Sequence, residues 1–97
     1  MQVLETKIEN RFVELVRQNN LQVAMVKLTL QGRTGWPDRL CLLPNGATLF
    51  IEFKRPGEEP RPRQRHVHSV IRSLGHDVQT FDDSQKAYNY LRRKVDT

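Results

Sequence analysis

Apolar positions recur with two different spacings along the chain, and together they predict an order of helices and strands. In residues 4–18 they recur every three to four positions, which is the spacing of one helical face. These positions are Leu4, Ile8, Phe12, Leu15 and Val16. Asn19 and Asn20 then favour a helix end, because their short polar side chains compete for backbone hydrogen bonds. Residues 21–30 are rich in aliphatic and β-branched side chains, which predicts a strand.

The middle of the chain predicts a hairpin followed by a second helix. Residues 38–43 and 47–54 are apolar runs on either side of the turn sequence "PNG", a pattern typical of two antiparallel strands. A proline-rich loop follows, and a helix begins near Pro62, a residue suited to a first helical turn. Gly75 is placed to end this helix. Its apolar positions are Val67, Val70, Ile71 and Leu74.

The last two elements complete the order. "HDVQTF" predicts a short strand, and Asp82, Asp83 or Ser84 is suited to cap a final helix. The resulting order, αβββαβα, predicts an α/β (α+β) fold in which helices flank a central mixed sheet. The length of the chain suits one small domain, residues 1–97.

The turn sequence decides which hairpin residues face each other. A two-residue turn at Asn45-Gly46 would pair Pro44 with Ala47, although Pro44 has no N–H to offer. A three-residue loop avoids this conflict, with Pro44 opening a type I turn and Gly46 in the left-handed conformation. We therefore predict the three-residue loop, which pairs Leu43 with Ala47.

This register brings charged side chains together at the open end of the hairpin. It sets Asp38 opposite Glu52, with Cβ atoms about 5 Å apart, and Lys54 points to the same side. Two carboxylates this close repel each other, and a divalent cation between them removes that cost. Their hard oxygen atoms suit Mg²⁺ or Mn²⁺ better than Zn²⁺. The alternative is an aspartate that caps a turn beside a Glu–Lys surface pair.

Charge and composition narrow the class of partner. Residues 1–52 hold six basic and five acidic side chains, whereas residues 53–97 hold ten and six, so the basic excess lies in the second half. A basic half favours polyanionic partners such as nucleic acid, although a solvated surface would look the same. The lone Cys41 offers neither an internal disulfide nor a zinc pattern. With no apolar run of about 20 residues and no signal sequence, we expect a cytoplasmic protein without membrane contact.

The hairpin motifs resemble a known family. "PD" at residues 37–38 and "EFK" at residues 52–54 match the signature of the PD-(D/E)XK nuclease superfamily. Their surroundings, "GWPDRL", "IEFK", a proline-rich loop and then Gln64 at the start of a helix, are similar to its VRR-NUC branch. The resemblance covers roughly residues 5–82 and implies a restriction-endonuclease-like fold, consistent with the order above. Phe53 departs from the aliphatic residue that is frequent between the glutamate and the lysine.

The resemblance implies a role for each matching residue. Asp38 and Glu52 would bind Mg²⁺ or Mn²⁺, with the backbone carbonyl of Phe53 completing the site. Lys54 would orient the attacking water and stabilise the negative charge that develops on the phosphate. Gln64 corresponds to a glutamine that lies near the site in the family.

A further carboxylate has two interpretations. Glu9 matches an acidic metal ligand that the family carries on its first helix. Thr6 to Glu9 also matches a capping box, in which Glu9 would only bind a backbone N–H. Because Leu4 already fits the apolar helical face, the helix is expected to begin before Thr6, which favours the ligand role. Glu5, one turn earlier, is the alternative ligand.

Other polar and aromatic residues are candidates for substrate contacts. Seven basic side chains near the motifs are suited to phosphate: Lys27, Arg33, Arg39, Arg55, Arg61, Arg63 and Arg65. Trp36 is expected to pack, with stacking on an unpaired base as the alternative. His66 and His68 lie two residues apart on a helix and do not share a face, so we do not expect them to bind a metal.

These observations predict a metal-dependent endonuclease that hydrolyses phosphodiester bonds in DNA. The resemblance implies branched DNA, such as Holliday junctions, and a homodimer that presents two active sites. The alternatives are a nucleic-acid-binding module without catalysis and a nuclease with another substrate, such as flap DNA or RNA.

Overall fold

A computed structural model describes residues 4–29 and 31–97. The helices are α1 (Glu5–Gln18), α2 (Pro62–Ser73) and α3 (Ser84–Val95), and a tight turn lies at Pro44–Gly46. The strands are β1 (Ala24–Lys27), β2 (Arg39–Leu42), β3 (Thr48–Phe53) and β4 (Asp77–Phe81). No helix within the described residues is long and apolar enough to cross a membrane.

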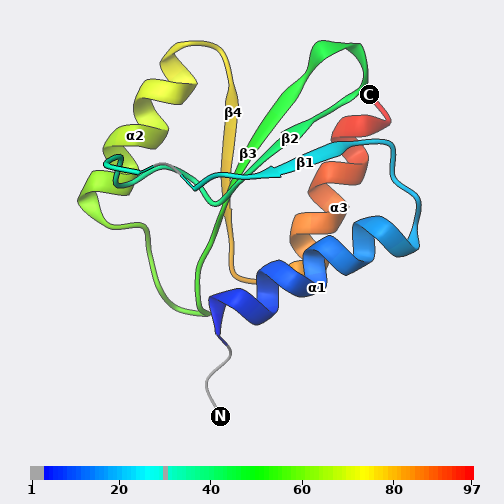
Figure 1. The fold of residues 1–97 in the computed structure, drawn as a ribbon, viewed down its shortest axis with the longest axis horizontal. Coiled ribbons are helices and arrows are strands. Elements are labelled where there is room, and N and C mark those ends of the chain that lie inside the picture. The colour runs from blue at the N-terminus through cyan, green and yellow to red at the C-terminus, as the bar shows by residue number, and fades with distance from the viewer. Residues whose placement is uncertain (1–3, 30) are drawn as a thin grey trace.

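The four strands form one mixed sheet in the order β1-β2-β3-β4. The first three strands pair antiparallel, and β4 joins β3 in parallel after the crossover through α2 (Figure 1). The predicted order αβββαβα and the mixed sheet flanked by helices are therefore confirmed.

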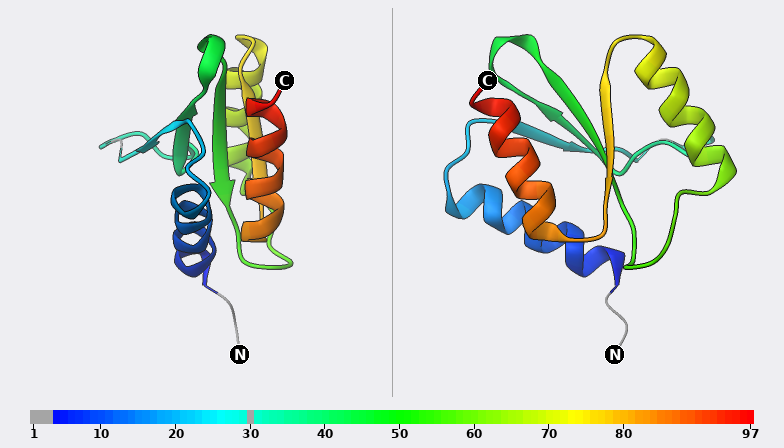
Figure 2. Two further views of the ribbon diagram at one scale, coloured as in Figure 1. Left: turned by 90° about the vertical axis from the view of Figure 1, so that its right-hand side faces the viewer. Right: turned by 180° about the vertical axis from the view of Figure 1, so that it is seen from behind.

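The helices cover the two faces of the sheet unequally. α1 and α3 lie together on one side of β4, and α2 lies on the other (Figures 1 and 2). The larger core lies under α1 and α3, where the ring of Phe12 packs 5.4 Å from that of Phe53. A smaller cluster holds α2 to the sheet, formed by Val67, Ile71, Val78, Trp36 and Phe50. Trp36 therefore packs, as predicted.

Within the strands the hairpin register is the predicted one, but the ladder ends at the pair of Arg39 with Ile51, so Asp38 and Glu52 do not form the predicted ladder pair. Cys41 pairs with Leu49, and beyond the strand ends the N–H of Leu43 donates to the carbonyl of Ala47 at 2.9 Å. The predicted turn type is wrong, because Asn45 has φ 66° and ψ 20° instead of the right-handed values that type I requires. Asparagine tolerates this left-handed conformation better than most residues, so the loop closes with two left-handed residues in succession.

The first strand is shorter than predicted. Residues 21–30 were expected to be extended, but β1 covers only Ala24–Lys27. The N–H of Val23 donates to the carbonyl of Leu21 at 2.9 Å, so this group is satisfied within its own segment instead of by β2. Leu30 lies outside the described residues.

The helix ends follow the predicted signals. Asp83 caps α3, and its Oδ1 accepts a hydrogen bond of 2.9 Å from the N–H of Lys86. Asn19 ends α1, and Gly75, with φ 92°, follows the last turn of α2. These local signals determine where each helix stops, and with it where the connecting loops begin.

Candidate functional site

Asp38 lies where the hairpin ladder becomes irregular. Its N–H donates to the carbonyl of Ile51 at 3.0 Å, and its carbonyl accepts a hydrogen bond of 2.9 Å from Leu28 of the neighbouring segment. Its carboxylate Oδ2 accepts the N–H of Phe53 at 2.8 Å, which places a side chain where a regular ladder would have a backbone carbonyl. The carboxylate is therefore held at the end of β3, beside Glu52.

The environment of Asp38 disfavours its ionised form. Burial raises the pKa of this carboxyl from 3.8 to about 6, and the negative charges of Glu52, Glu9 and Glu5 add to the increase. The hydrogen bond from Phe53 opposes the increase without cancelling it. Three glutamates, two from α1 and one from β3, thus act on the carboxylate of Asp38.

Glu52 points from β3 toward α2 and is buried. Its Oε2 accepts a hydrogen bond of 3.1 Å from Nε2 of Gln64. The Oε1 atom of Gln64 accepts the backbone N–H of Arg61 at 2.8 Å, and this fixes which end of the amide faces Glu52. Oε1 of Glu52 is buried without a hydrogen-bond partner in the described structure, and Nε2 of His68 lies 3.8 Å away.

Glu9 projects from α1 toward β2 and is only 6% exposed. Its Oε2 lies 2.6 Å from Nε of Arg39 and 3.7 Å from Nζ of Lys27. The capping-box interpretation is wrong, because α1 begins after Leu4 and Thr6 already lies inside the helix. Glu9 therefore faces the site, where two cations balance its charge.

Lys54 follows β3 and is 4% exposed. Its backbone N–H donates to the carbonyl of Phe81 at 2.9 Å, which extends the parallel pairing with β4 by one residue. In the part of the chain that the structure describes, Lys54 takes part in no ion pair. Lys54 is thus buried at the end of β3, two residues after Glu52, without an ion pair in the described structure.

The donors at this place fit a hard divalent cation in part. Asp38 and Glu52 supply carboxylate oxygens, and the unpartnered Oε1 of Glu52 together with the raised pKa of Asp38 indicates negative charge that the protein leaves unbalanced. Within the described residues, however, no three His, Cys, Asp or Glu side chains gather closely enough to hold a metal ion by themselves. Glu9, the third predicted ligand, is bonded to Arg39.

The predicted basic residues divide into two groups. The first group forms ion pairs within the protein. Lys27 and Arg39 contact the carboxylate of Glu9, and Nε of Arg55 lies 2.6 Å from Oε1 of Glu58. The remaining four side chains are exposed on the loop before β2, at the residue that precedes α2 and in the first turn of α2: Arg33, Arg61, Arg63 and Arg65. We call these four the α2 basic surface.

A glycine joins the two segments of this surface. A Cβ at Gly35 would lie 2.8 Å from Cγ and 2.9 Å from the carbonyl oxygen of Arg63, so only glycine allows the loop to approach α2 this closely. The positive φ of 86° also favours glycine. The contact brings the loop that carries Arg33 to the start of α2, close to Gln64.

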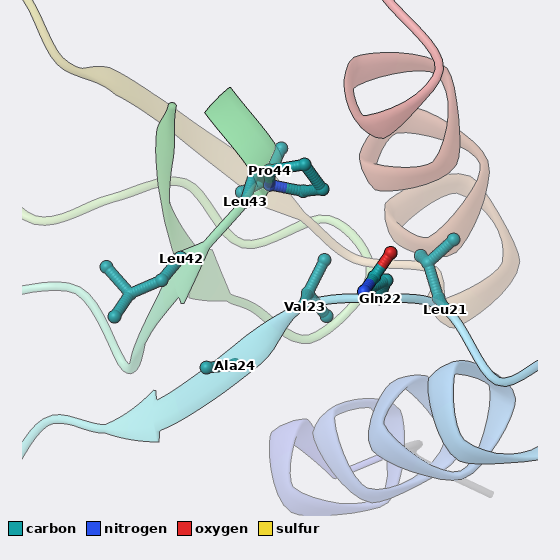
Figure 3. A pocket seen from close by; sticks show the side chains of 7 residues that line it. All are labelled: Leu21, Gln22, Val23, Ala24, Leu42, Leu43 and Pro44. Carbon is teal, nitrogen blue, oxygen red and sulfur yellow. The ribbon is translucent and has the colours of Figure 1, made fainter. Parts of the chain in front are cut away.

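Two hollows on the surface of the described residues differ in their chemistry. One, of about 400 Å³, lies between the start of β1 and the end of β2 and is lined largely by aliphatic side chains (Figure 3). It contains no ionisable side chain and is remote from Asp38 in the hairpin. A second, of about 290 Å³, is lined by Leu4, Glu5, Thr6 and Arg55, and it borders the carboxylates through Glu5. The charged groups, and not the larger hollow, mark the candidate site.

Sequence reasoning missed His68. The prediction that His66 and His68 lie on different faces of the helix is confirmed, because His66 is exposed whereas His68 is only 2% exposed. The informative spacing was from Gln64 to His68, because residues four apart share a helical face and Gln64 was already assigned to the site.

Comparisons with known proteins indicate the family of this chain. No family model matches the chain. It is 41% identical over 80 residues to "Putative nuclease p44" of Acyrthosiphon pisum secondary endosymbiont phage 1, covering 82% of this chain and 84% of that protein. It also resembles a solved structure described as "VRR_NUC domain", with a TM-score of 0.77 and 28% identity over 91% of this chain and 94% of the other. The chain therefore belongs to the VRR-NUC family of nucleases, as its motifs predicted.

Proposed function

We propose that this nuclease is a metal-dependent endonuclease that hydrolyses DNA with Mg²⁺ or Mn²⁺. The observation that carries the proposal is the carboxylate pair of Asp38 and Glu52. Burial, and then the charge of Glu52, raise the pKa of Asp38 to about 6, and Oε1 of Glu52 is buried without a hydrogen-bond partner in the described structure. Asp38, Glu52 and the backbone carbonyl of Phe53 would hold the cation. Glu9 is the proposed further ligand from α1, and Glu5 is its alternative, since both act on Asp38.

The bound cation would neutralise phosphate oxygens and lower the pKa of the water that attacks phosphorus. The protein supplies the remaining groups. Lys54 places an ammonium beside the phosphate, where it stabilises the charge that develops in the transition state. Gln64 restrains Glu52 through its 3.1 Å hydrogen bond. The product is a cleaved phosphodiester with no covalent bond between enzyme and substrate.

We propose branched DNA, such as a Holliday junction, as the preferred substrate. The α2 basic surface supports this proposal, because its guanidinium groups suit phosphates, and phosphate contacts carry no direct information about base sequence. Contacts to phosphates follow the path of the DNA backbone, which favours selection by DNA shape.

We also propose that the nuclease acts as a homodimer. β1 is an edge strand, and the sheet face beside it exposes Val26 at 43% and Leu42 at 44%. Burial of such side chains between two copies would stabilise a small protein and present two active sites to a junction. Light scattering at high protein concentration tests this, and a monodisperse monomer contradicts it.

Cleavage assays test the catalytic proposal. Labelled four-way junctions, flaps, plain duplex and RNA are incubated with Mg²⁺, with Mn²⁺ and with a chelator, using wild type and Lys54→Ala. We expect cleavage of junctions only with metal, and a loss of at least about 100-fold in kcat for the variant. Cleavage that persists in the chelator contradicts the mechanism, and binding without cleavage favours a nucleic-acid-binding module.

A control variant separates catalysis from general charge. Lys86→Ala removes an exposed lysine from α3, away from the carboxylates. We expect it to cleave at the wild-type rate. If both lysine variants lose activity equally, the loss reflects charge and not the position of Lys54.

A further inference from the structure

One buried polar contact of the site is incomplete, and it involves a side chain without a role in the proposed chemistry. Nε2 of His68 lies 3.8 Å from Oε1 of Glu52, beyond hydrogen-bond distance. The two side chains are 3% and 5% exposed, and neither atom has a hydrogen-bond partner in the described structure. Buried polar atoms without partners destabilise a protein, so this pair needs a physical explanation.

The other oxygen of Glu52 already has a partner from the same helix. Nε2 of Gln64 donates to Oε2 at 3.1 Å, and Gln64 cannot turn away easily because its Oε1 accepts the N–H of Arg61. Gln64 and His68 are four residues apart and therefore lie on one face of α2. The helix thus directs one nitrogen toward each oxygen of the carboxylate.

We infer that His68 is a positioning residue that donates its Nε2–H to Oε1 of Glu52. A movement of about 1 Å by either side chain brings the two atoms to hydrogen-bond distance. With Gln64 on Oε2, this bond fixes the rotation of the carboxylate about its own axis. Each carboxylate oxygen has two lone pairs, so both oxygens keep one for another ligand.

A fixed carboxylate binds a cation more tightly, because less side-chain freedom is lost on binding. This consequence rests on the proposed metal-dependent function. The hydrogen bond itself does not, since it is a property of the metal-free protein.

Two substitutions and one control test the inference. His68→Leu replaces the imidazole, and with it the Nε2–H donor, by an apolar side chain of similar size. His68→Gln places an amide N–H near the position of Nε2. His66→Leu is the matched control, because it removes an exposed imidazole from the same helix. Mn²⁺ affinity is measured by calorimetry without nucleic acid, and thermal unfolding reports whether each variant is folded.

We expect His68→Leu to weaken Mn²⁺ binding by about 10- to 100-fold, as for other residues that orient a metal ligand. His68→Gln should recover most of the affinity, and His66→Leu should bind as the wild type does. Wild-type affinity in a folded His68→Leu overturns the inference. So does a folded His68→Gln that binds as weakly as His68→Leu, because that result would make the imidazole a direct ligand.

A second measurement does not involve metal. The ¹⁵N chemical shift of Nε2 in His68 is compared between the wild type and Glu52→Gln in chelator. We expect the shift to change, because the charged acceptor is lost, and the His66 signal to stay the same. An unchanged His68 signal overturns the inference even if His68→Leu fails to fold. If the wild type binds no Mn²⁺, the proposed function fails, and this comparison still decides whether the bond exists.

Discussion

Asp38→Asn should make the metal-free protein more stable at neutral pH, although it removes a residue of the active site. The folded protein keeps a proton on Asp38 up to a pKa of about 6, whereas the unfolded chain releases it near 3.8. The stability that this proton contributes is complete below pH 3.8 and is lost as the pH rises through 6. Asparagine carries no charge, and its amide oxygen can still accept the N–H of Phe53.

The shift of the pKa sets the size of the effect. About two pH units correspond to about 3 kcal/mol for a group fully removed from water. Asp38 is only partly buried, so solvent screens its charge, and we expect a gain of about 1 to 2 kcal/mol above pH 7. For a protein of this length, that gain raises the melting temperature by about 5 to 15 °C.

Urea unfolding in chelator from pH 4.5 to 8 measures this difference. The difference in stability between the variant and the wild type should be smallest at pH 4.5 and should grow as the pH rises through 6. Asp82→Asn, which removes an exposed carboxylate, is the control for the change in net charge. Saturating Mn²⁺ at pH 8 should stabilise only the wild type, by about 3 kcal/mol at 100 times its dissociation constant. A variant that is less stable than the wild type at pH 8 in chelator would refute the reasoning.

Two further predictions concern the framework around the site. Gly35→Ala should cost about 2 kcal/mol or more, because the added methyl group meets Arg63 at 2.8 Å and φ is positive. Gly46→Ala has a similar φ of 78° but open space around it, and should cost only about 1 kcal/mol; equal losses in urea unfolding would contradict the close contact. Asp83→Ala removes the acceptor of the Lys86 N–H and should lower the free energy of unfolding by about 1 kcal/mol, and an unchanged urea midpoint would show that α3 does not need this cap.

The approach of the hairpin to α2 explains why part of the site escaped sequence reasoning. Val67 and Ile71 pack against Phe50 and Val78, and this packing brings His68 to Glu52 across sixteen positions of the chain. A helical pattern shows which residues share a face, but it does not show which strand residue that face will meet. The position of His68 beside Glu52 therefore depends on how α2 packs on the sheet, and not only on the spacing of residues along the helix.

The same limit applies to charge pairs. Arg39 was expected to contact phosphate, and the structure directs its guanidinium to Glu9 at 2.6 Å. The two residues are thirty positions apart, and they meet because alternate side chains of β2 point to the α1 face of the sheet. The alternation was visible in the sequence, but the place where α1 crosses β2 was not.

What the sequence determined by itself was local: the helical faces, the helix ends and the hairpin register, because each depends on the spacing or backbone restriction of neighbouring residues. Pro44 and Gly46 selected the three-residue loop, and that loop aligned Asp38 with the end of β3. Only the tertiary structure decided how the aligned groups are held. The irregular ladder at Asp38, the Gln64 and His68 nitrogens directed toward Glu52, and the loop closed over Arg63 all depend on segments distant in the chain. Such contacts arise from packing of the whole fold, whose energy is shared among many residues and is not encoded at any one position.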